Sequence, residues 1–226
     1  TLNIPQRFIF NAPITRTAQT QPLQSILQII MKIVILLFDN YTALDIVGPY
    51  EVLSRLPDSK IYLVALEKRE YCDPYGLKIS SDYTINEIYQ ADILLIPGGL
   101  GIDSLLLNQK ILDWVLKIDN STKWTLSVCS GSLLLAQAGL LNGKNCTTHW
   151  KRKDQLKKYA LTIKNERYVQ DGKIITSAGV SAGIDMALYM ASKIIGDHGA
   201  KMIQRGIEYD PKPPFDYSSP DIMPMG

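Results

Sequence analysis

The pattern that most constrains the fold is an alternation of short, unbroken apolar runs with longer segments of helical periodicity. The run KIVILLF at 32–38 precedes a helical segment within 39–57, and the same order recurs along the chain. A strand that is apolar on both faces belongs to a sheet covered by helices on both sides. The alternation therefore predicts an α/β fold with a mostly parallel central sheet.

The remaining elements follow from the same reading. Strands are expected at 60–66, 92–97, 123–128 and 145–149, with a hairpin at 167–177. Helices are expected around 103–118, at 130–141 with Gly143 as the stop, at 150–160 and at 181–196. Pro49 suits the first turn of the first helix, and Pro57 lies just after its end.

The last helix of this series has its own signals. Ser181 is the expected N-cap, and Asp185 in the first turn complements the helix dipole, which is a structural role. Met186, Tyr189 and Met190 recur at helical spacing and are expected to lie in the core or in a dimer contact.

The two ends of the chain differ from its middle. Residues 1–30 are rich in Gln and Thr, contain three prolines and show no sustained period, so we expect a disordered extension. Its basic, acid-free composition weakly resembles an organellar presequence, although no secretory signal is evident. Residues 31–226 are expected to form a single domain that ends in an extended proline-rich tail, PKPPFDYSSPDIMP.

Charge and cysteine content exclude several classes of protein. Without the two arginines of residues 1–30 the chain has 22 basic and 22 acidic residues, so we expect no nucleic-acid partner. The basic run KRKDQLKK at 151–158 is interpreted as the solvated face of a helix. The apolar run IVILLF is much shorter than the roughly 20 residues that span a bilayer, which predicts a soluble protein with no membrane partner. Three cysteines are too few to stabilise this chain by disulfide bonds, which favours a location in the reducing cytoplasm.

The segment SVCSGSLLLAQAGLL contains the strongest candidate for chemistry, Cys129. This cysteine lies where a buried strand turns into a helix, at the sheet edge where open α/β folds bind their ligands. Unpaired N–H groups at a helix N-terminus favour an ionised thiol, so the position suits a nucleophile. The alternative is a buried, inert cysteine, which is the commonest fate of this residue type.

A glycine turn, PGG at 97–99, follows the preceding strand at the same edge. Gly98 and Gly99 allow backbone amides to approach a reacting centre, and we expect an oxyanion hole from the N–H groups of Gly99 and Ser130. Gly98 and Val180 complete the residues expected to bind substrate. The same glycines also fit a plain turn.

Several side chains compete to manage protons beside Cys129. Neither histidine, His149 nor His198, neighbours it in sequence, and a Cys-His hydrolase requires His149 to fold back to the thiol. Asp45 lies in the loop that leaves the first strand and is the preferred carboxylate, with Asp39 and Glu51 as competitors. A zinc site through Cys146 and His149 is disfavoured because no second pair of ligands accompanies them.

Taken together, these motifs resemble the ThiJ/PfpI superfamily, which is class I glutamine amidotransferase-like, and within it the isonitrile (isocyanide) hydratase branch. The resemblance runs from about Met31 to Pro224 and rests on the ordered segments LDIVGPYEVL, IPGG, SVCSGSLLLAQAGLLNGK, TTHW, SAGVSAGIDMAL and EYDPKPPFDYSSPD. As a set these motifs are highly specific, whereas the IPGG turn alone is not.

The resemblance implies a flavodoxin-like αβα sandwich that is usually dimeric, with Cys129 as the nucleophile on a strained elbow and Asp45 as its acidic partner. Ser130 stands where the branch typically has threonine, which affects rate or pocket shape more than reaction type. The protease-like members have histidine after the cysteine, so peptidase activity is disfavoured. The helix-turn-helix module of related regulators has no counterpart here.

We therefore expect a hydro-lyase that hydrates isonitriles to N-substituted formamides through a cysteine thioimidate, without metal or organic cofactor. In water, a thiolate beside a neutral carboxylic acid is uphill by about 6 kcal/mol, so the site is expected to lower the pKa of Cys129 and raise that of Asp45. Two alternatives stay open: a glyoxalase-like hydratase of small carbonyls, and a redox-responsive cysteine protein without turnover.

Overall fold

The computed structural model describes residues 30–215, and its centre is a seven-stranded sheet in the order β10-β11-β7-β6-β1-β2-β5. All neighbouring strands are parallel except β10, which pairs antiparallel with β11. These strands are β1 (Met31–Leu36), β2 (Ser59–Ala65), β5 (Tyr83–Thr84), β6 (Ile93–Ile96), β7 (Trp124–Ser127), β10 (Tyr168–Asp171) and β11 (Ile174–Ser177). The predicted mostly parallel sheet is confirmed.

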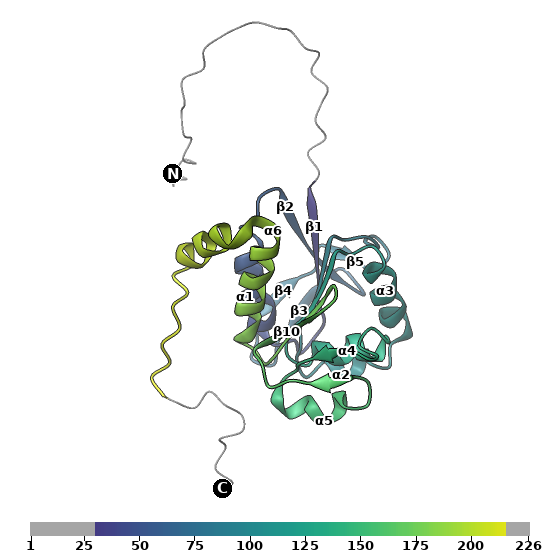
Figure 1. The fold of residues 1–226 in the computed structure, drawn as a ribbon. Helices are drawn as coiled ribbons and strands as arrows, with labels where there is room; N and C mark the ends of the chain where they lie inside the picture. The colour runs from purple at the N-terminus through teal and green to yellow at the C-terminus, as the bar shows by residue number, and fades with distance from the viewer. Residues whose placement is uncertain (1–29, 216–226) are drawn as a thin grey trace, which may run out of the picture.

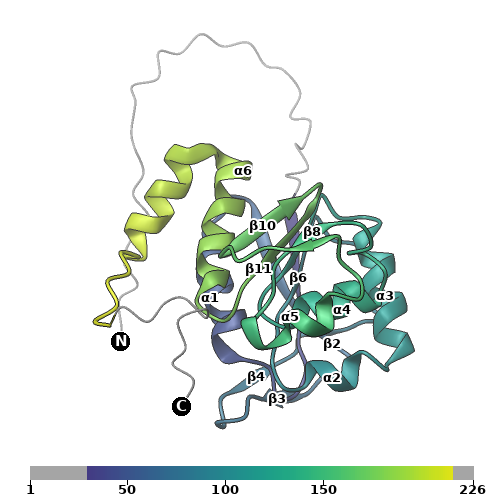
Figure 2. The same cartoon turned by 60° about the horizontal axis from the view of Figure 1, so that its bottom comes forward.

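Helices cover both faces of the sheet, which gives the three layers of a flavodoxin-like sandwich (Figures 1 and 2). One face carries α1 (Ala43–Leu53) and α6 (Ala182–Gly206), and the other carries α2 (Ile102–Leu105), α3 (Gln109–Asp119), α4 (Gly131–Gln137) and α5 (Lys153–Leu156). Burial on both faces explains why β1 and β6 are continuous apolar runs: Ile33–Leu36 and Ile93–Ile96 are almost fully inaccessible.

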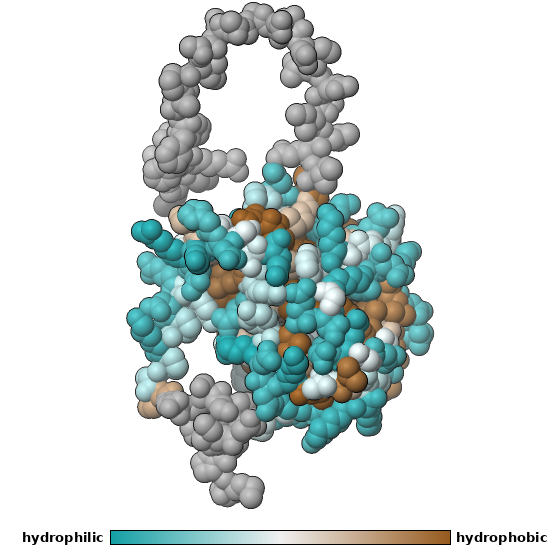
Figure 3. Space-filling model, in the orientation of Figure 1, coloured by the Kyte–Doolittle hydropathy of each residue, from teal (hydrophilic) through white to brown (hydrophobic). Residues whose placement is uncertain are grey.

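Five small strands lie outside the central sheet or at its edge. Sequence analysis did not anticipate β5, or the antiparallel pair β3 (Glu70–Cys72) and β4 (Lys78–Ser80), because such short, polar pairs carry almost no period. The predicted strand at 145–149 is the two-residue β8 (Asn145–Cys146), which pairs with β9 (Thr162–Ile163). Hydrophilic side chains cover most of the face seen in Figure 3.

Three helix predictions were wrong in their bounds. The segment around 103–118 is two helices, because Asn108 starts α3 by accepting a hydrogen bond from Ile111 N–H at 3.2 Å. The helix expected at 130–141 ends at Gln137, because Gly139 adopts a φ of +82° and Leu140 N–H closes on Leu135 O at 2.9 Å. Gly143 is therefore not the stop. The basic segment 150–160 holds only η1 (Trp150–Arg152) and α5.

The helices α1 and α6 also differ from expectation. Pro49 lies inside α1 rather than in its first turn, on the side that packs against Gly183 of α6. α6 continues past the predicted end at Gly196 to Gly206, with a kink at Gly196 where φ is 75°. Beyond this kink the second half of α6 turns away from the sheet (Figure 2).

Some predictions are not tested by this structure. The expected extension falls almost entirely on residues 1–29, and most of the proline-rich tail falls on 216–226, which lie outside the described residues. Within residues 30–215, no helix is long and apolar enough to cross a membrane.

Candidate active site

Cys129 lies on a tight connection between β7 and α4, at the carboxyl edge of the parallel strands. Its φ of 56° lies in the left-handed region, which is sparsely populated by residues other than glycine. Such a conformation costs about 1–3 kcal/mol and persists only where the surroundings hold it. The side chain is buried, with 7% of its surface exposed.

Side-chain hydroxyls of Ser132 in α4 and of Thr148 fix the backbone of this elbow. Thr148 Oγ1 donates to the carbonyl of Cys129 at 2.9 Å, Ser132 Oγ donates to the same carbonyl at 3.2 Å, and Ser132 Oγ donates to Thr148 Oγ1 at 2.8 Å. All three groups are buried. Sequence analysis missed these two residues as part of the site, although both lie inside motifs that it used, CSGS and TTHW.

Asp45 reaches the site from the first turn of α1. It is fully buried, and its Oδ2 accepts a hydrogen bond from Gly98 N–H at 2.9 Å. Oδ1 has no hydrogen-bond partner in the part of the chain that the structure describes, and the carboxyl lies close enough to Cys129 for its charge to raise the pKa of that thiol. The predicted pair of Cys129 and Asp45 therefore comes together in the structure.

The glycine turn packs directly against the cysteine elbow. A Cβ on Gly98 would lie 2.6 Å from Ser130 N and 2.8 Å from Cys129 Cβ, so only glycine fits there. Gly99, with a φ of +144°, donates its N–H to Ser130 Oγ at 3.0 Å. Gly99 N–H is thus engaged in this structure and is not the free oxyanion donor expected from sequence. Gly98, which was expected to bind substrate, directs its N–H to Asp45.

The backbone N–H groups that face the sulfur come from two other residues. Ser130 and Val180 each donate a backbone hydrogen bond to Cys129, and the Ser130 hydroxyl adds a weaker one. Ser130 therefore contacts both Cys129 and the glycine turn. Val180 was expected to bind substrate, and in this structure its amide faces the sulfur of Cys129.

The surroundings of Asp45 bring its pKa close to neutral pH. Burial raises the pKa of Asp45 from its ordinary 3.8 to about 7, against the smaller lowering effects of the Gly98 N–H and the Cys129 thiol. A carboxyl group with this pKa exchanges its proton easily at physiological pH, as a general acid or base must.

The thiol behaves differently from the sequence expectation. Burial first, and the charge of Asp45 second, raise the pKa of Cys129 to about 12, while the N–H groups of Ser130 and Val180 only partly offset this. The expected low thiol pKa was wrong, because burial outweighs two backbone donors and α4 is only seven residues long. The resting site therefore holds a protonated sulfur beside a carboxyl that titrates near neutrality.

The raised pKa of Asp45 predicts a pH-dependent effect on stability. Between pH 3.8 and about 7 the unfolded chain loses this proton while the folded chain keeps it, so stability falls as pH rises through this window. Asp45→Asn lacks this loss and is expected to be more stable than the parent at about pH 8, by up to about 4 kcal/mol. Urea unfolding of both proteins at about pH 4 and about pH 8 measures the difference. An equal difference at both pH values contradicts the raised pKa.

The competing carboxylates serve other purposes. Asp39 forms an ion pair with Arg69 at 2.5 Å and accepts Cys72 N–H at 3.2 Å, so it ties the loop after β1 to β3. Glu51 is exposed and pairs at 2.7 Å with Arg55, which lies just beyond the end of α1. Neither is directed at the cysteine elbow.

His149 does not take the place of a base beside the thiol. Its Nδ1 accepts Lys151 N–H at 3.2 Å and its ring packs against Gly179. Burial, with the charges of Lys151 and Arg152, lowers the pKa of His149, so the ring is neutral at physiological pH.

Cys146 is fully buried, and burial raises the pKa of its thiol to about 11. Among residues 30–215, no cluster of three or more metal-binding side chains occurs.

The predicted start of α6 is only partly confirmed. Ser181 occupies the N-cap position but makes no capping hydrogen bond, because its hydroxyl interacts with Arg167 instead at 3.4 Å. Asp185 forms an ion pair with Arg167.

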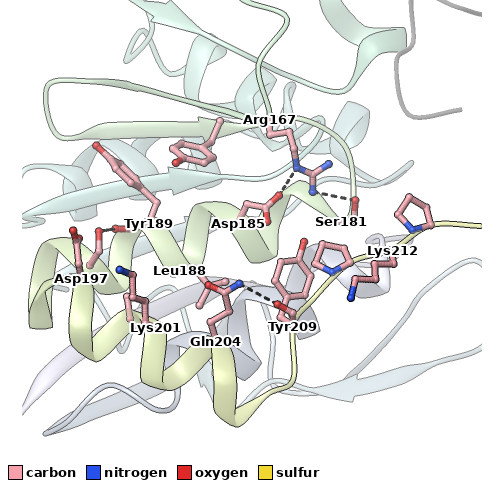
Figure 4. Close-up of a pocket in the computed structure, with 15 residues that line it drawn as sticks. Arg167, Ser181, Asp185, Leu188, Tyr189, Asp197, Lys201, Gln204, Tyr209 and Lys212 are labelled. Atoms are coloured by element: carbon pink, nitrogen blue, oxygen red, sulfur yellow. Dashed lines mark hydrogen bonds and ion pairs between the residues drawn. The ribbon is translucent and has the colours of Figure 1, made fainter. Parts of the chain in front are cut away.

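Ser181 and Asp185 line a groove of about 1060 Å³, which lies between the two halves of α6 and residues 209–213 (Figure 4). Met186 and Met190 are buried, as one of the two expected placements required.

A flavodoxin-like sandwich with a cysteine in a left-handed elbow, beside a buried carboxyl, defines a class of cysteine-centred α/β proteins. This chain belongs to the DJ-1/PfpI family, whose sequence model matches residues 31–193.

Among its relatives is the isonitrile hydratase of Pseudomonas putida, which is 38% identical over 194 residues that cover 86% of this chain and 85% of that protein. A crystal structure of a ThiJ/PfpI family protein from Pseudomonas syringae superposes with a TM-score of 0.81 at 32% identity, over 90% of this chain and 86% of that one. The deglycase PfpI of Pyrococcus furiosus is 25% identical over 65% of this chain and 89% of that protein.

Proposed function

We propose that this protein hydrates isonitriles to N-substituted formamides, as a hydro-lyase. The observation that carries the proposal is the buried pair of Cys129 and Asp45, in which a thiol lies beside a carboxyl whose pKa is about 7. The relative named isonitrile hydratase, which is similar over most of both chains, supports the choice of substrate class. The substrate is a small molecule, and the scheme needs no metal or organic cofactor.

The first half of the reaction forms a covalent thioimidate. Above about pH 7 the Asp45 carboxylate accepts the thiol proton of Cys129 as the sulfur attacks the terminal carbon of R–N≡C. Asp45 then delivers this proton to the same carbon, which gives R–N=CH–S–Cys129. The backbone N–H groups of Ser130 and Val180 stabilise the negative charge that develops on sulfur during the attack.

The second half releases the formamide. Water adds to the thioimidate carbon while Asp45 takes one of its protons and passes it to the nitrogen, which gives R–NH–CH(OH)–S–Cys129. Asp45 then takes the hydroxyl proton as the carbon–sulfur bond breaks and gives it to the sulfur, and R–NH–CHO leaves. The two hydrogens of water end on the nitrogen and on the regenerated thiol, so the pair returns to its starting state.

A second candidate reaction uses the same nucleophile on a small carbonyl compound. Similarity to a protein named deglycase supports this glyoxalase-like activity as the second candidate. A redox-responsive role without turnover is less well supported, because oxidation of cysteine follows thiolate character and exposure, and Cys129 is buried with a raised pKa.

Product analysis separates these functions. The protein is incubated in parallel with a panel of alkyl and aryl isonitriles and with methylglyoxal, and products are identified by mass spectrometry. We expect the N-substituted formamides from the isonitriles. Lactate from methylglyoxal without any formamide contradicts the proposal, and so does oxidation of Cys129 by mild peroxide without either product.

We further propose that the protein is a cytoplasmic homodimer. α1 presents an apolar stripe to solvent, with Leu44, Val47 and Tyr50 exposed by 38%, 43% and 41%. A second copy of the chain suits this stripe, because an isologous contact places α1 of one protomer against α1 of the other. Since α1 also carries Asp45, such a contact stabilises the site in both protomers. All three cysteines are free, which fits a reducing compartment. Analytical ultracentrifugation of the parent and of Val47→Glu tests the dimer.

A further inference from the structure

The groove between the two halves of α6 and residues 209–213 is separate from the cysteine site (Figure 4). Its volume is about 1060 Å³, and apolar side chains such as Leu188, Ala200 and Tyr209 form part of its walls. Soluble proteins seldom leave large apolar surfaces open to water. The groove therefore points to an occupant.

Residues 197–215 form one wall of the groove, and we call this segment the arm. It begins directly after the kink in α6, where Gly196 has a φ of 75°. Two side chains in its helical part are buried, whereas Met202 is 52% exposed and Phe215 is 78% exposed. A helix this short is marginally stable by itself in water, so a further contact stabilises the arm.

The arm lies on the same side of the sheet as α1 (Figures 1 and 2). The exposed stripe of Leu44, Val47 and Tyr50 belongs to that helix. Figure 3 shows open space between the arm and the rest of the described chain. A single partner on this side of the molecule can therefore contact the α1 stripe and enter the groove.

The charges that line the groove are not all paired. Its charged side chains are those of Arg167, Asp185, Asp197, Lys201 and Lys212. Three of the five are held in ion pairs within the chain. The side chains of the other two, Asp197 and Lys201, form no ion pair or hydrogen bond with any residue of 30–215.

The spacing of these two residues makes their lack of a pair informative. Asp197 and Lys201 are four residues apart on one helix, and both line the groove (Figure 4). Glu51 and Arg55 have the same spacing and form an ion pair at 2.7 Å. Asp197 and Lys201 instead remain available to an occupant of the groove.

An occupant that carries charges of both signs suits this pair best. A small anion is attracted by Lys201 but repelled by Asp197 one turn away, and a small cation meets the reverse situation. A second copy of the chain supplies both charges, because an isologous contact is reciprocal. Asp197 of each protomer then lies against Lys201 of the other, so each dimer contains two such pairs.

We propose that this groove is an interface with a second copy of the chain, in which the arm clasps the partner and Asp197 pairs reciprocally with Lys201. The inference rests on the proposed homodimer and assigns it a surface beyond the α1 stripe. It involves neither Cys129 nor the substrate, so it is testable without any isonitrile.

Sedimentation velocity of the full chain, over a dilution series at about 50 mM salt where screening is limited, measures the dissociation constant of the dimer. Lys201→Glu and Asp197→Lys each create two like-charge contacts per dimer, so each is expected to raise this constant by about tenfold or more. Both side chains are exposed, so neither change is expected to disturb the fold. Lys158→Glu makes the same change of charge at an exposed residue just after α5, and this matched control is expected to leave the constant unchanged.

Mixing the two weakened variants gives the sharper test. In a heterodimer of Lys201→Glu with Asp197→Lys, every reciprocal contact again joins opposite charges. The equimolar mixture is therefore expected to form dimers with a dissociation constant within about threefold of that of the parent. An ion pair confined to one chain gives no such recovery, because each variant then keeps its own like-charge pair.

Three results overturn the proposal. The first is a parental dissociation constant in both single variants; if Val47→Glu nevertheless dissociates the dimer, the homodimer stands and the groove is not part of it. The second is a mixture that stays as dissociated as its two components. The third is a parent that sediments as a monomer throughout, which removes the homodimer as well. Formamide release reports on the proposed reaction alone, so the failure of that reaction is recognised separately.

Discussion

Replacing Cys129 with alanine is expected to lower the rate of isonitrile hydration by about 10³-fold or more, because the covalent intermediate can no longer form. The fold should persist, since alanine is smaller than cysteine and is no more strained at a φ of 56° than the residue it replaces. Initial rates of formamide release, measured with saturating aryl isonitrile, report the loss.

The matched control is Cys72→Ala, because this cysteine is free and lies at the end of β3 away from the elbow. Its activity is expected to equal that of the parent. Retention of even a tenth of the parental rate in Cys129→Ala, with Cys72→Ala fully active, is incompatible with covalent catalysis at this sulfur.

Asp45→Asn is expected to reduce the same activity by about 10²–10⁴-fold, because an amide occupies the place of the carboxyl but cannot carry a proton. The asparagine side chain can still accept the hydrogen bond from Gly98 N–H, so the turn is expected to keep its position. In the parent, kcat/KM is expected to rise as pH increases through about 7, where Asp45 becomes the base, and the residual rate of Asp45→Asn is expected to lack this step.

The control for this variant is Glu51→Gln, which neutralises an exposed carboxylate on the same helix. It is expected to leave both the rate and its pH dependence unchanged. A parental rate in Asp45→Asn, or the same pH step in both proteins, means that another group manages the protons.

The sheet and the pairing of Cys129 with Asp45 could be predicted from sequence for one physical reason. A strand that is apolar on both faces belongs to a parallel sheet covered by helices on both sides. The strands of such a sheet bring their carboxyl ends to one edge. The first turn of α1, which carries Asp45, and the turn that carries Cys129 both lie at that edge. The order of motifs then identified which carboxylate accompanies the cysteine.

The details that failed depend on burial and on tertiary contacts. The sign of the pKa shift of Cys129 reflects a balance between burial and two amides, and only the folded structure gives both. The engagement of Gly99 N–H by Ser130 Oγ is a contact between residues far apart in sequence. The end of α4 at Gly139 and the kink at Gly196 depend on which of several glycines adopts a positive φ, and composition does not distinguish them.

The central claim is that one buried carboxyl beside Cys129, that of Asp45, gains and loses its proton near neutral pH. Its most direct test is a carbon-13 NMR titration of aspartate-labelled protein, with the Asp45 carboxyl signal assigned by its absence in Asp45→Asn. The account predicts a midpoint near pH 7, as burial of this carboxyl requires. A midpoint close to the ordinary 3.8 contradicts it, since Asp45 then stays ionised and cannot return a proton during the reaction.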